Sequence, residues 1–277
     1  MLIDLHSHSY YSDGVLSPES LVSMANEAGC DIFALTDHDS VEGLTEAKIE
    51  SKKIGLNLIS GVEISATWSN STIHIVGLRI DEKNITLLDG LNQHKELRLD
   101  RAVRIARGLS GAGIYGALAK TQKLASGGMI TRTHFAQMLI QEGICKDMKS
   151  VFRRYLTGKK PGGVSVKWVS FVDVIDWIHV AGGVAVIAHP FRYRMTNTKI
   201  KRMMSDLKDA GCDGVEVVTG TSTSDEITLT NKWANEFGFL SSCGSDYHGW
   251  PNQRIEIGNL QELPEPKKCI INKILNG

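Results

Sequence analysis

The chain has 277 residues, enough to bury the core of one large α/β barrel or of two modest domains. Its 31 Lys and Arg residues balance 31 Asp and Glu residues, so no global charge attracts it to nucleic acid or to an anionic membrane. The five cysteines form no C-x-x-C pair, which argues against a disulfide framework and favours a reducing compartment. Because "MLIDLH" leaves no room for a cleavable signal and no apolar run approaches the ~18 residues of a membrane span, we expect a soluble cytoplasmic protein.

Seven short runs rich in aliphatic and β-branched residues are typical of strands buried on both faces. In chain order they are "LIDLH" (2–6), "DIFALTDHD" (31–39), "LNLISGVEIS" (56–65), "TIHIVGLRI" (72–80), "GVAVIAHP" (183–190), "DGVEVV" (213–218) and "FGFLSSCGSDYH" (237–248). Helix patterns lie between them, such as 17–29 with Ser17 as N-cap and Gly29 at its end, and 197–211 ending at Gly211. This alternation predicts a parallel sheet in a closed or nearly closed (β/α) barrel; the alternative is an open doubly wound sheet, which is disfavoured because about seven repeats occur and no glycine-rich dinucleotide fingerprint follows the first strand.

One segment, from about residue 96 to 168, contains no strand-like run. It holds amphipathic patterns such as "LRLDRAVRIARGLS", "THFAQMLIQEG" and "SVFRRYLTG". We expect a helical insertion subdomain over 96–168 that divides the barrel into 1–95 and 169–277. The alternative is that these helices are the ordinary layer covering the sheet, because periodicity does not say what a helix packs on.

Side chains of metal-ligand type gather where the predicted strands end. They are His6, His8, Asp13, His38, Glu63, His189, Asp246 and His248, with His74 near the start of the fourth strand. The carboxyl ends of barrel strands are the face where active sites form. Imidazole and carboxylate ligands without thiolate suit manganese, zinc or iron, and nine ligands are too many for one ion. We therefore expect two or three divalent ions, manganese first, with Glu63 as a bridge. His94 and His179 lie in helix patterns and are left out of the set.

The motifs "DLHSHS…SDG", "ALTDHD", "GVEIS", "HIVG", "AHP" and "GSDYH" resemble, in order and spacing, those of the polymerase and histidinol phosphatase (PHP) superfamily of metal-dependent phosphoesterases. The likeness covers nearly the whole chain. The stretches "TRTHFAQML" and "VFRRYLTGKKPGGVSVKW" resemble the branch of 3′,5′-nucleoside bisphosphate phosphatases, whose relatives include 5′-to-3′ exoribonucleases.

The resemblance implies a distorted (β/α)7 barrel and a role for each ligand. The implied metal sets are His6, His8, Glu63 and Asp246 for one ion, Asp13, His38 and His248 for a second, and Glu63, His74 and His189 for a third. It also implies that Arg132 and His134 contact the substrate phosphate, with Arg101 and Arg192 as further candidates. One departure is Phe191, which stands where relatives often carry Gly and could narrow the cleft beside His189.

The expected function is removal of the 3′-phosphate from nucleoside 3′,5′-bisphosphates by a metal-activated hydroxide, with Arg132 gripping phosphate and His134 protonating the leaving oxygen as general acid. An imidazole with its ordinary pKa suits that role. The expected partner is a small nucleotide, or short RNA, with no membrane and no obligate protein partner. The alternatives are a 5′-to-3′ exoribonuclease, a histidinol phosphate phosphatase, which "TRTHFA" disfavours, and a non-catalytic metal-stabilised domain, which the complete ligand set disfavours.

Overall fold

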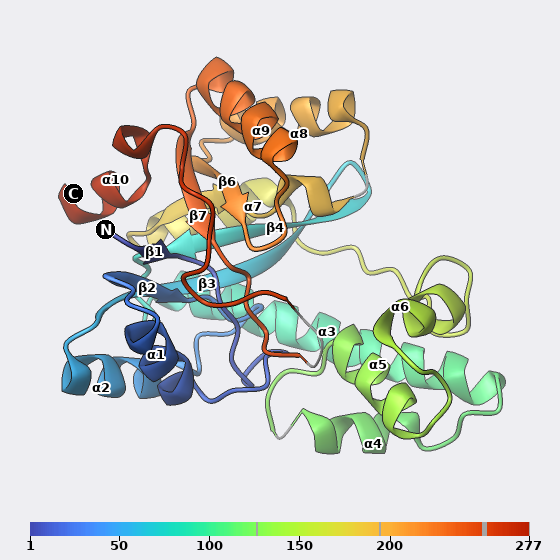
Figure 1. The fold of residues 1–277 in the computed structure, drawn as a ribbon. Coiled ribbons are helices and arrows are strands. Elements are labelled where there is room, and N and C mark those ends of the chain that lie inside the picture. Colours follow the sequence, from blue (N-terminus) through green and yellow to red (C-terminus); the bar gives the residue numbers. More distant parts are fainter. Residues whose placement is uncertain (126, 194, 251–253, 277) are drawn as a thin grey trace.

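The structure is a computed structural model that describes residues 1–125, 127–193, 195–250 and 254–276, which include every predicted site residue. Seven strands form one sheet in chain order (Figure 1). They are β1 (Ile3–Asp4), β2 (Ile32–Leu35), β3 (Asn57–Trp68), β4 (Ser71–Leu78), β5 (Val184–Ile187), β6 (Gly214–Thr219) and β7 (Leu240–Gly244). The sheet curls back on itself, because Leu5 N–H donates to the Cys243 carbonyl at 3.0 Å beside β1 and β7. The predicted nearly closed seven-stranded α/β barrel is thereby confirmed.

The expectation of a wholly parallel sheet is wrong for β4, which runs antiparallel to both β3 and β5. A tight turn at Ser69 and Asn70, with φ of 44° and 62°, joins β3 to β4 and leaves no room for a crossover helix. The start of β4 therefore lies at the same edge as the ends of the parallel strands. This explains why His74 lies early in its strand, where it pairs with Ser65. Glu63 lies in the middle of β3 and not at its end, because the hairpin extends beyond the sheet.

Five of the described helices pack on the outer face of the sheet (Figure 1). They are α1 (Pro18–Glu27), α2 (Leu44–Ile54), α7 (Phe171–Val180), α8 (Asn197–Asp209) and α9 (Ser224–Phe237). Helix α10 (Ile271–Asn276) packs Ile271 and Ile274 against the opposite face of the strands, in a second cluster with Leu5 and Ala34, and η2 (Pro190–Tyr193) and η3 (Pro266–Lys268) are short 3₁₀ turns. The predicted helix ends are observed: Ser17 Oγ accepts from Ser20 N–H, and Gly29 and Gly211 follow their helices with φ of 81° and 92°. Aliphatic side chains of helices and strands form the main core between these two layers.

The remaining helices stand to one side of the barrel (Figure 1). They are α3 (Ile85–Gly111), α4 (Ala117–Leu124), α5 (Arg132–Gln141), α6 (Met148–Val151) and the π-helix η1 (Phe152–Leu156). The first half of α3 packs Leu87 and Leu91 into the main core, whereas the apolar side chains of the other helices and of the rest of α3, including Ile105, Phe135 and Leu139, form a separate cluster. Helix α3 runs across the predicted boundary between residues 95 and 96, so the division of the chain into 1–95, 96–168 and 169–277 stays a prediction. Within the described ranges, no helix has both the length and the apolar character needed to cross a bilayer.

Candidate metal centre and anion pocket

The structure brings the nine predicted metal ligands together at the edge of the barrel where the parallel strands end. Their atoms form three groups in which every ligand atom lies within 4.8 Å of the others: His8, Asp13, His38 and His248; His6, His8 and Glu63; and His38, Glu63 and His74. The two remaining residues lie against these groups. Asp246 Oδ1 is 3.1 Å from His8 Nε2, and His189 Nε2 is 2.9 Å from Glu63 Oε1.

Glu63 is at the centre of the cluster. Its Oε1 lies 2.9 Å from His74 Nδ1 and 2.9 Å from His189 Nε2. Its Oε2 lies 2.7 Å from His38 Nδ1, 3.3 Å from His8 Nε2 and 3.4 Å from His6 Nε2. A carboxylate that faces five imidazoles has the position that a bridging ligand needs. The closeness of His38 to Glu63 is a detail that the predicted sets did not include.

The donor set fits divalent metal ions. Asp13, Glu63 and Asp246 are buried; Asp13 Oδ1 lies 3.2 Å from His248 Nε2 and Glu63 Oε2 lies 2.7 Å from His38 Nδ1, but neither oxygen accepts a hydrogen bond of good geometry from the described residues. Burial alone would raise the pKa of Glu63, but the neighbouring imidazoles of His38 and His74 hold it well below its usual range. Buried anionic oxygens need nearby positive charge, and bound cations supply it. Burial and the charge of His248 lower the pKa of His8 to about 3, which keeps this imidazole in the neutral form that binds metal.

Glu216 is a functional residue that the sequence analysis missed. Its Oε1 accepts from His6 Nδ1 at 2.6 Å, and its Oε2 accepts from the His189 backbone N–H at 2.6 Å. With Nδ1 donating to Glu216, His6 presents Nε2 to the cluster, the arrangement that an outer carboxylate gives a metal-binding histidine. The available signal was a single acidic residue among aliphatic neighbours in "DGVEVV".

A second missed carboxylate, Asp37, shapes the loop that carries Asp13. It accepts from Ser9 N–H at 2.8 Å and from the hydroxyls of Ser9 and Ser12, each at 2.6 Å. Gly14 closes the same loop against the His8 backbone so tightly that a Cβ would lie 2.0 Å from the His8 carbonyl oxygen. The turn predicted from "SDG" therefore also positions Asp13 as a ligand-type side chain.

An anion pocket adjoins the metal cluster. Its wall includes Arg98, Arg101 and Arg132 from the helical part, and it opens beside Asp13 and His38. Arg101 is strongly affected by this crowding: burial and the charges of Arg132 and Arg98 lower its pKa to about 8, and its Nε has no hydrogen-bond partner among the described residues. Because a guanidinium keeps its proton in proteins, the arginines give this pocket positive charge that a bound anion would balance.

The sequence analysis did not include Arg98 among the site residues. Its guanidinium is held by hydrogen bonds to two side chains. Its Nε donates to Asp39 Oδ2 at 2.6 Å, and its Nη2 donates to Ser65 Oγ at 3.1 Å. Its guanidinium carbon lies 5.2 Å from the ring centroid of Trp168, and that of Arg101 lies 5.8 Å from the same ring. Trp168 therefore aligns two of the three cations through cation–π contacts.

His134 lies on the first turn of α5 and is almost completely buried. Its Nδ1 accepts from Thr131 N–H at 3.1 Å as part of a capping box. In the neutral ring the proton is therefore on Nε2. Burial lowers the pKa of His134 in spite of the nearby Asp13. The expectation of an imidazole with its ordinary pKa does not hold.

Arg192 does not line the anion pocket. It forms an ion pair with Asp246 and hydrogen bonds with Thr221 Oγ1, on the other side of the metal cluster. Its neighbour Phe191 stacks on Trp233, with ring centroids 5.9 Å apart, and lines a small cleft together with His189. The two histidines left out of the ligand set have other partners: His94 pairs with Asp39 and His179 with Asp213.

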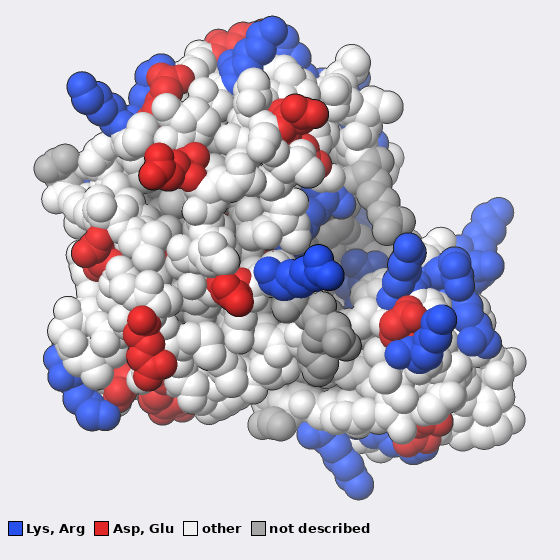
Figure 2. All heavy atoms as spheres, viewed as in Figure 1, with Lys and Arg blue, Asp and Glu red and all other residues white. Residues whose placement is uncertain are grey.

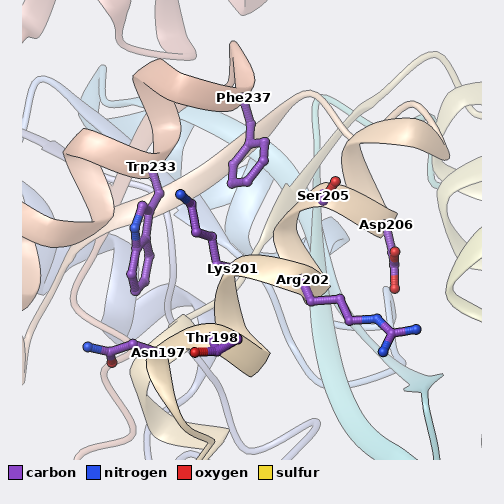
Figure 3. Close-up of a pocket in the computed structure, with 8 residues that line it drawn as sticks. All are labelled: Asn197, Thr198, Lys201, Arg202, Ser205, Asp206, Trp233 and Phe237. Atoms are coloured by element: carbon purple, nitrogen blue, oxygen red, sulfur yellow. The ribbon is translucent and has the colours of Figure 1, made fainter.

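A groove on the outside of the barrel lies between α8 and α9 (Figure 3). The Lys201 side chain lies between Trp233 and Phe237 in this view, and its Nζ pairs with Glu236 at 2.7 Å. Asp206, at the same groove, accepts from Trp68 Nε1 at 2.8 Å. None of the predicted site residues lines the groove, so it is separate from the metal cluster.

Residues 4–161 match the PHP domain family. The chain belongs to this family. It is 42% identical to a 3′,5′-nucleoside bisphosphate phosphatase of Chromobacterium violaceum, over 95% of this chain and 92% of that protein. It is also 42% identical to a 5′-3′ exoribonuclease of Haemophilus influenzae, over 94% of each. A solved amidohydrolase from Chromobacterium violaceum, with sulfate bound and no metal, superposes with a TM-score of 0.93 at 41% identity, over 99% of this chain and 96% of that one.

Membership of the PHP family and the relatives' activities define the class of reaction. The chain is a hydrolase that cleaves phosphoester bonds, and its cluster of His, Asp and Glu side chains fits the divalent metals on which such chemistry relies. The prediction of family and enzyme class from the sequence motifs is confirmed.

Proposed function

We propose that the chain removes the 3′-phosphate from nucleoside 3′,5′-bisphosphates, converting adenosine 3′,5′-bisphosphate to 5′-AMP and phosphate. One observation carries the proposal: the ligand cluster and the arginine-lined pocket adjoin at Asp13 and His38. A substrate with two phosphates can place one at each position. The full-length similarity to the phosphatase of Chromobacterium violaceum supports this assignment.

The metal-holding residues are proposed to be those of the three predicted sets: His6, His8, Glu63 and Asp246; Asp13, His38 and His248; and Glu63, His74 and His189. We propose two or three divalent ions, manganese first and zinc or iron as alternatives, since imidazole and carboxylate ligands suit all three. Bound ions would supply positive charge to the reacting phosphate and make water a stronger nucleophile at neutral pH.

The protein's own groups orient the substrate. Arg101 and Arg132 grip the phosphate that does not react, and Arg98 adds a third positive charge that Asp39 partly balances. Three guanidiniums against the carboxylates of Asp39 and Asp13 leave one net positive charge, and a metal ion bound at Asp13 would add to it, which suits a phosphate anion. The binding energy of this anchored group orients the reacting one. His134 donates through Nε2–H to the oxygen that leaves, as a neutral hydrogen-bond donor.

The second candidate is a 5′-to-3′ exoribonuclease acting on short 5′-phosphorylated RNA. The relative from Haemophilus influenzae, which matches this chain as well as the phosphatase does, favours it. The same anchor would hold the 5′-phosphate, and a diester would replace the 3′-monoester at the metal cluster.

Product analysis of the metal-loaded protein tests both candidates. The phosphatase assignment expects phosphate and 5′-AMP from adenosine 3′,5′-bisphosphate, and much slower hydrolysis of 3′-AMP, which has no 5′-phosphate to anchor. A main product of 3′-AMP would show that the substrate binds in the opposite direction. Fast trimming of a 5′-phosphorylated oligoribonucleotide without phosphate release from the bisphosphate would reject the phosphatase in favour of the exoribonuclease.

A further inference from the structure

The hydroxyl of Tyr193 interrupts the hydrogen-bond ladder between β4 and β5. One residue beyond the paired register of these antiparallel strands, the Ala188 N–H donates to the His74 carbonyl at 3.1 Å. A directly opposed pair of this kind normally exchanges a second bond, from the His74 N–H to the Ala188 carbonyl. Here the His74 N–H donates to Tyr193 Oη at 2.9 Å, and the Tyr193 hydroxyl donates to the Ala188 carbonyl at 2.7 Å. One side-chain oxygen therefore takes the place of a direct backbone bond.

This interruption lies beside two of the ligand-type histidines. His74 Nδ1 and His189 Nε2 each lie 2.9 Å from Glu63 Oε1. The Tyr193 ring also meets the His189 ring edge-on, with ring centroids 5.4 Å apart and an angle of 60° between the planes. Tyr193 therefore contacts the backbone of one of these histidines and the imidazole of the other.

The Tyr193 side chain is suited to holding a fixed geometry. Its ring is partly exposed and packs against the main core, while its hydroxyl end is buried, and this burial raises the pKa of Tyr193 well above its usual range. The hydroxyl therefore keeps the proton that it donates. His189 needs such support, because its φ of 25° is a strained conformation that persists only where the surroundings hold it.

We propose that Tyr193 is a positioning residue that sets the spacing of His74 and His189 and thereby controls the affinity for the third metal ion. The inference rests on the proposed function, since it takes Glu63, His74 and His189 as the third set. Without the hydroxyl, the strands either close through a direct bond, which moves both imidazoles, or leave the His74 N–H and the Ala188 carbonyl unpaired. The other two sets take their remaining ligands from the ends of β1, β2 and β7, so they are not affected.

The proposed substrate anchor is separate from Tyr193. Figure 2 shows Lys and Arg side chains crowded around the helical part, beside the hollow that separates it from the barrel. The anion pocket takes Arg98, Arg101 and Arg132 from that part, and Tyr193 does not line it. Loss of the hydroxyl should therefore lower kcat more than it raises KM.

The test is Tyr193→Phe, which removes only the hydroxyl, in a titration of the metal-free full chain with manganese followed by calorimetry and electron paramagnetic resonance. We expect three ions in the parent. In the variant one of them should bind about 10–100-fold more weakly, the range for loss of an outer partner, while the other two are unchanged. Hydrolysis should fall and should return in excess manganese. The matched control is Tyr155→Phe, which loses a hydroxyl bonded to Arg154 in the helical part and should keep all three affinities.

Amide hydrogen exchange of the metal-free protein separates positioning from folding. Exchange should become faster at the His74 N–H in Tyr193→Phe, with little change in the melting temperature. Equal weakening of all three ions, or no weakening, would overturn the inference, as would a parent that binds only two ions. Phosphate release from adenosine 3′,5′-bisphosphate by the metal-loaded parent is measured alongside. If it is absent while Tyr193→Phe still loses one ion, the proposed function fails and the inference stands; the reverse result rejects the inference alone.

Discussion

Asp39 and Arg98 form a buried ion pair that joins the metal centre to the anion pocket. Arg98 Nε lies 2.6 Å from Asp39 Oδ2, and the two residues are 6% and 1% exposed. Asp39 follows the ligand-type residue His38, and its N–H donates to the Glu63 carbonyl at 2.8 Å. Its φ of 47° is unusual for a residue other than glycine. The pair therefore fixes the distance between the two halves of the site.

Replacing Asp39 by Asn should destabilise the fold by about 3–5 kcal/mol, because it leaves Arg98 as a buried, uncompensated charge. Chemical denaturation with two independent probes measures the change. Asp100→Asn, which removes an exposed partner of Arg104, is the control and should cost at most about 1 kcal/mol. Equal stability of the Asp39 variant and the parent would show that water or other groups balance the charge and accept the hydrogen bonds of Arg98.

Asp39 should also give the stability a characteristic dependence on pH. Burial alone would raise the pKa of Asp39, but Arg98 and His94 hold it well below its usual range. The stabilisation is therefore fully present above the pKa of about 3.9 that the unfolded chain has, and it is lost as the pH falls towards the lower pKa of the folded state. The unfolding free energy of the parent should decline below about pH 4, and Asp39→Asn should decline less steeply. Parallel curves would argue against a charged Asp39.

Glu63→Gln tests the shared carboxylate. The amide removes a negative charge from the centre of five imidazoles, so metal affinity should fall by more than the about 10–100-fold that follows loss of an outer partner. Elemental analysis and titration with manganese measure the change, and hydrolysis should fall with it. The control is Glu82→Gln, whose carboxylate pairs with Lys48 away from the cluster. Unchanged metal content in Glu63→Gln would rule out a bridging role.

Arg132→Ala tests the anchor for phosphate. Loss of a charge-assisted hydrogen bond of about 1.5–3 kcal/mol should lower kcat/KM by about 10- to 150-fold, mainly through KM, with metal content unchanged. Arg107→Ala removes an exposed arginine from the same helical part and should have little effect. If Arg132→Ala instead loses metal or unfolds, the arginine is structural.

His134 should remain neutral, with its proton on Nε2, throughout the neutral pH range. Because its pKa is lowered and its Nδ1 is already an acceptor, the ring does not titrate where the enzyme works. Nitrogen NMR chemical shifts of the ring report the tautomer directly. His134→Gln, which keeps a side-chain N–H donor, should lower kcat without changing the shape of the pH–rate profile. If one limb of that profile disappears in the variant, His134 titrates in the working range and acts as a general acid.

Much of the fold could be predicted because alternating aliphatic strands and capped helices leave strong local signals. The ligands could be predicted because His6, His8, Asp246 and His248 lie in short motifs at strand ends. The direction of β4 could not be predicted, because the apolar pattern of "TIHIVGLRI" does not distinguish a parallel strand from an antiparallel one. The turn that decides the direction consists only of Ser69 and Asn70.

The supporting residues of the site were harder to predict. Glu216 lies between valines inside a short buried strand, and Arg98 lies on a long amphipathic helix that carries many charged residues. Their partners, His6 and Asp39, are more than fifty residues away in the chain. Contacts between distant segments follow from the closed barrel and leave no spacing that a single sequence displays.

The closing of the barrel has a consequence for when the enzyme becomes complete during synthesis. His8, which follows the first strand, meets Asp246, which follows the last, at 3.1 Å. The complete ligand cluster therefore needs the chain as far as His248, although two of its three groups consist of residues 6–74 alone. A nascent polypeptide still attached to the ribosome has no intact metal site until residues 246–248 have emerged and β7 has docked beside β1. The full set of ligands is accordingly assembled only when the last strand has docked, and premature termination leaves a fragment that lacks Asp246 and His248.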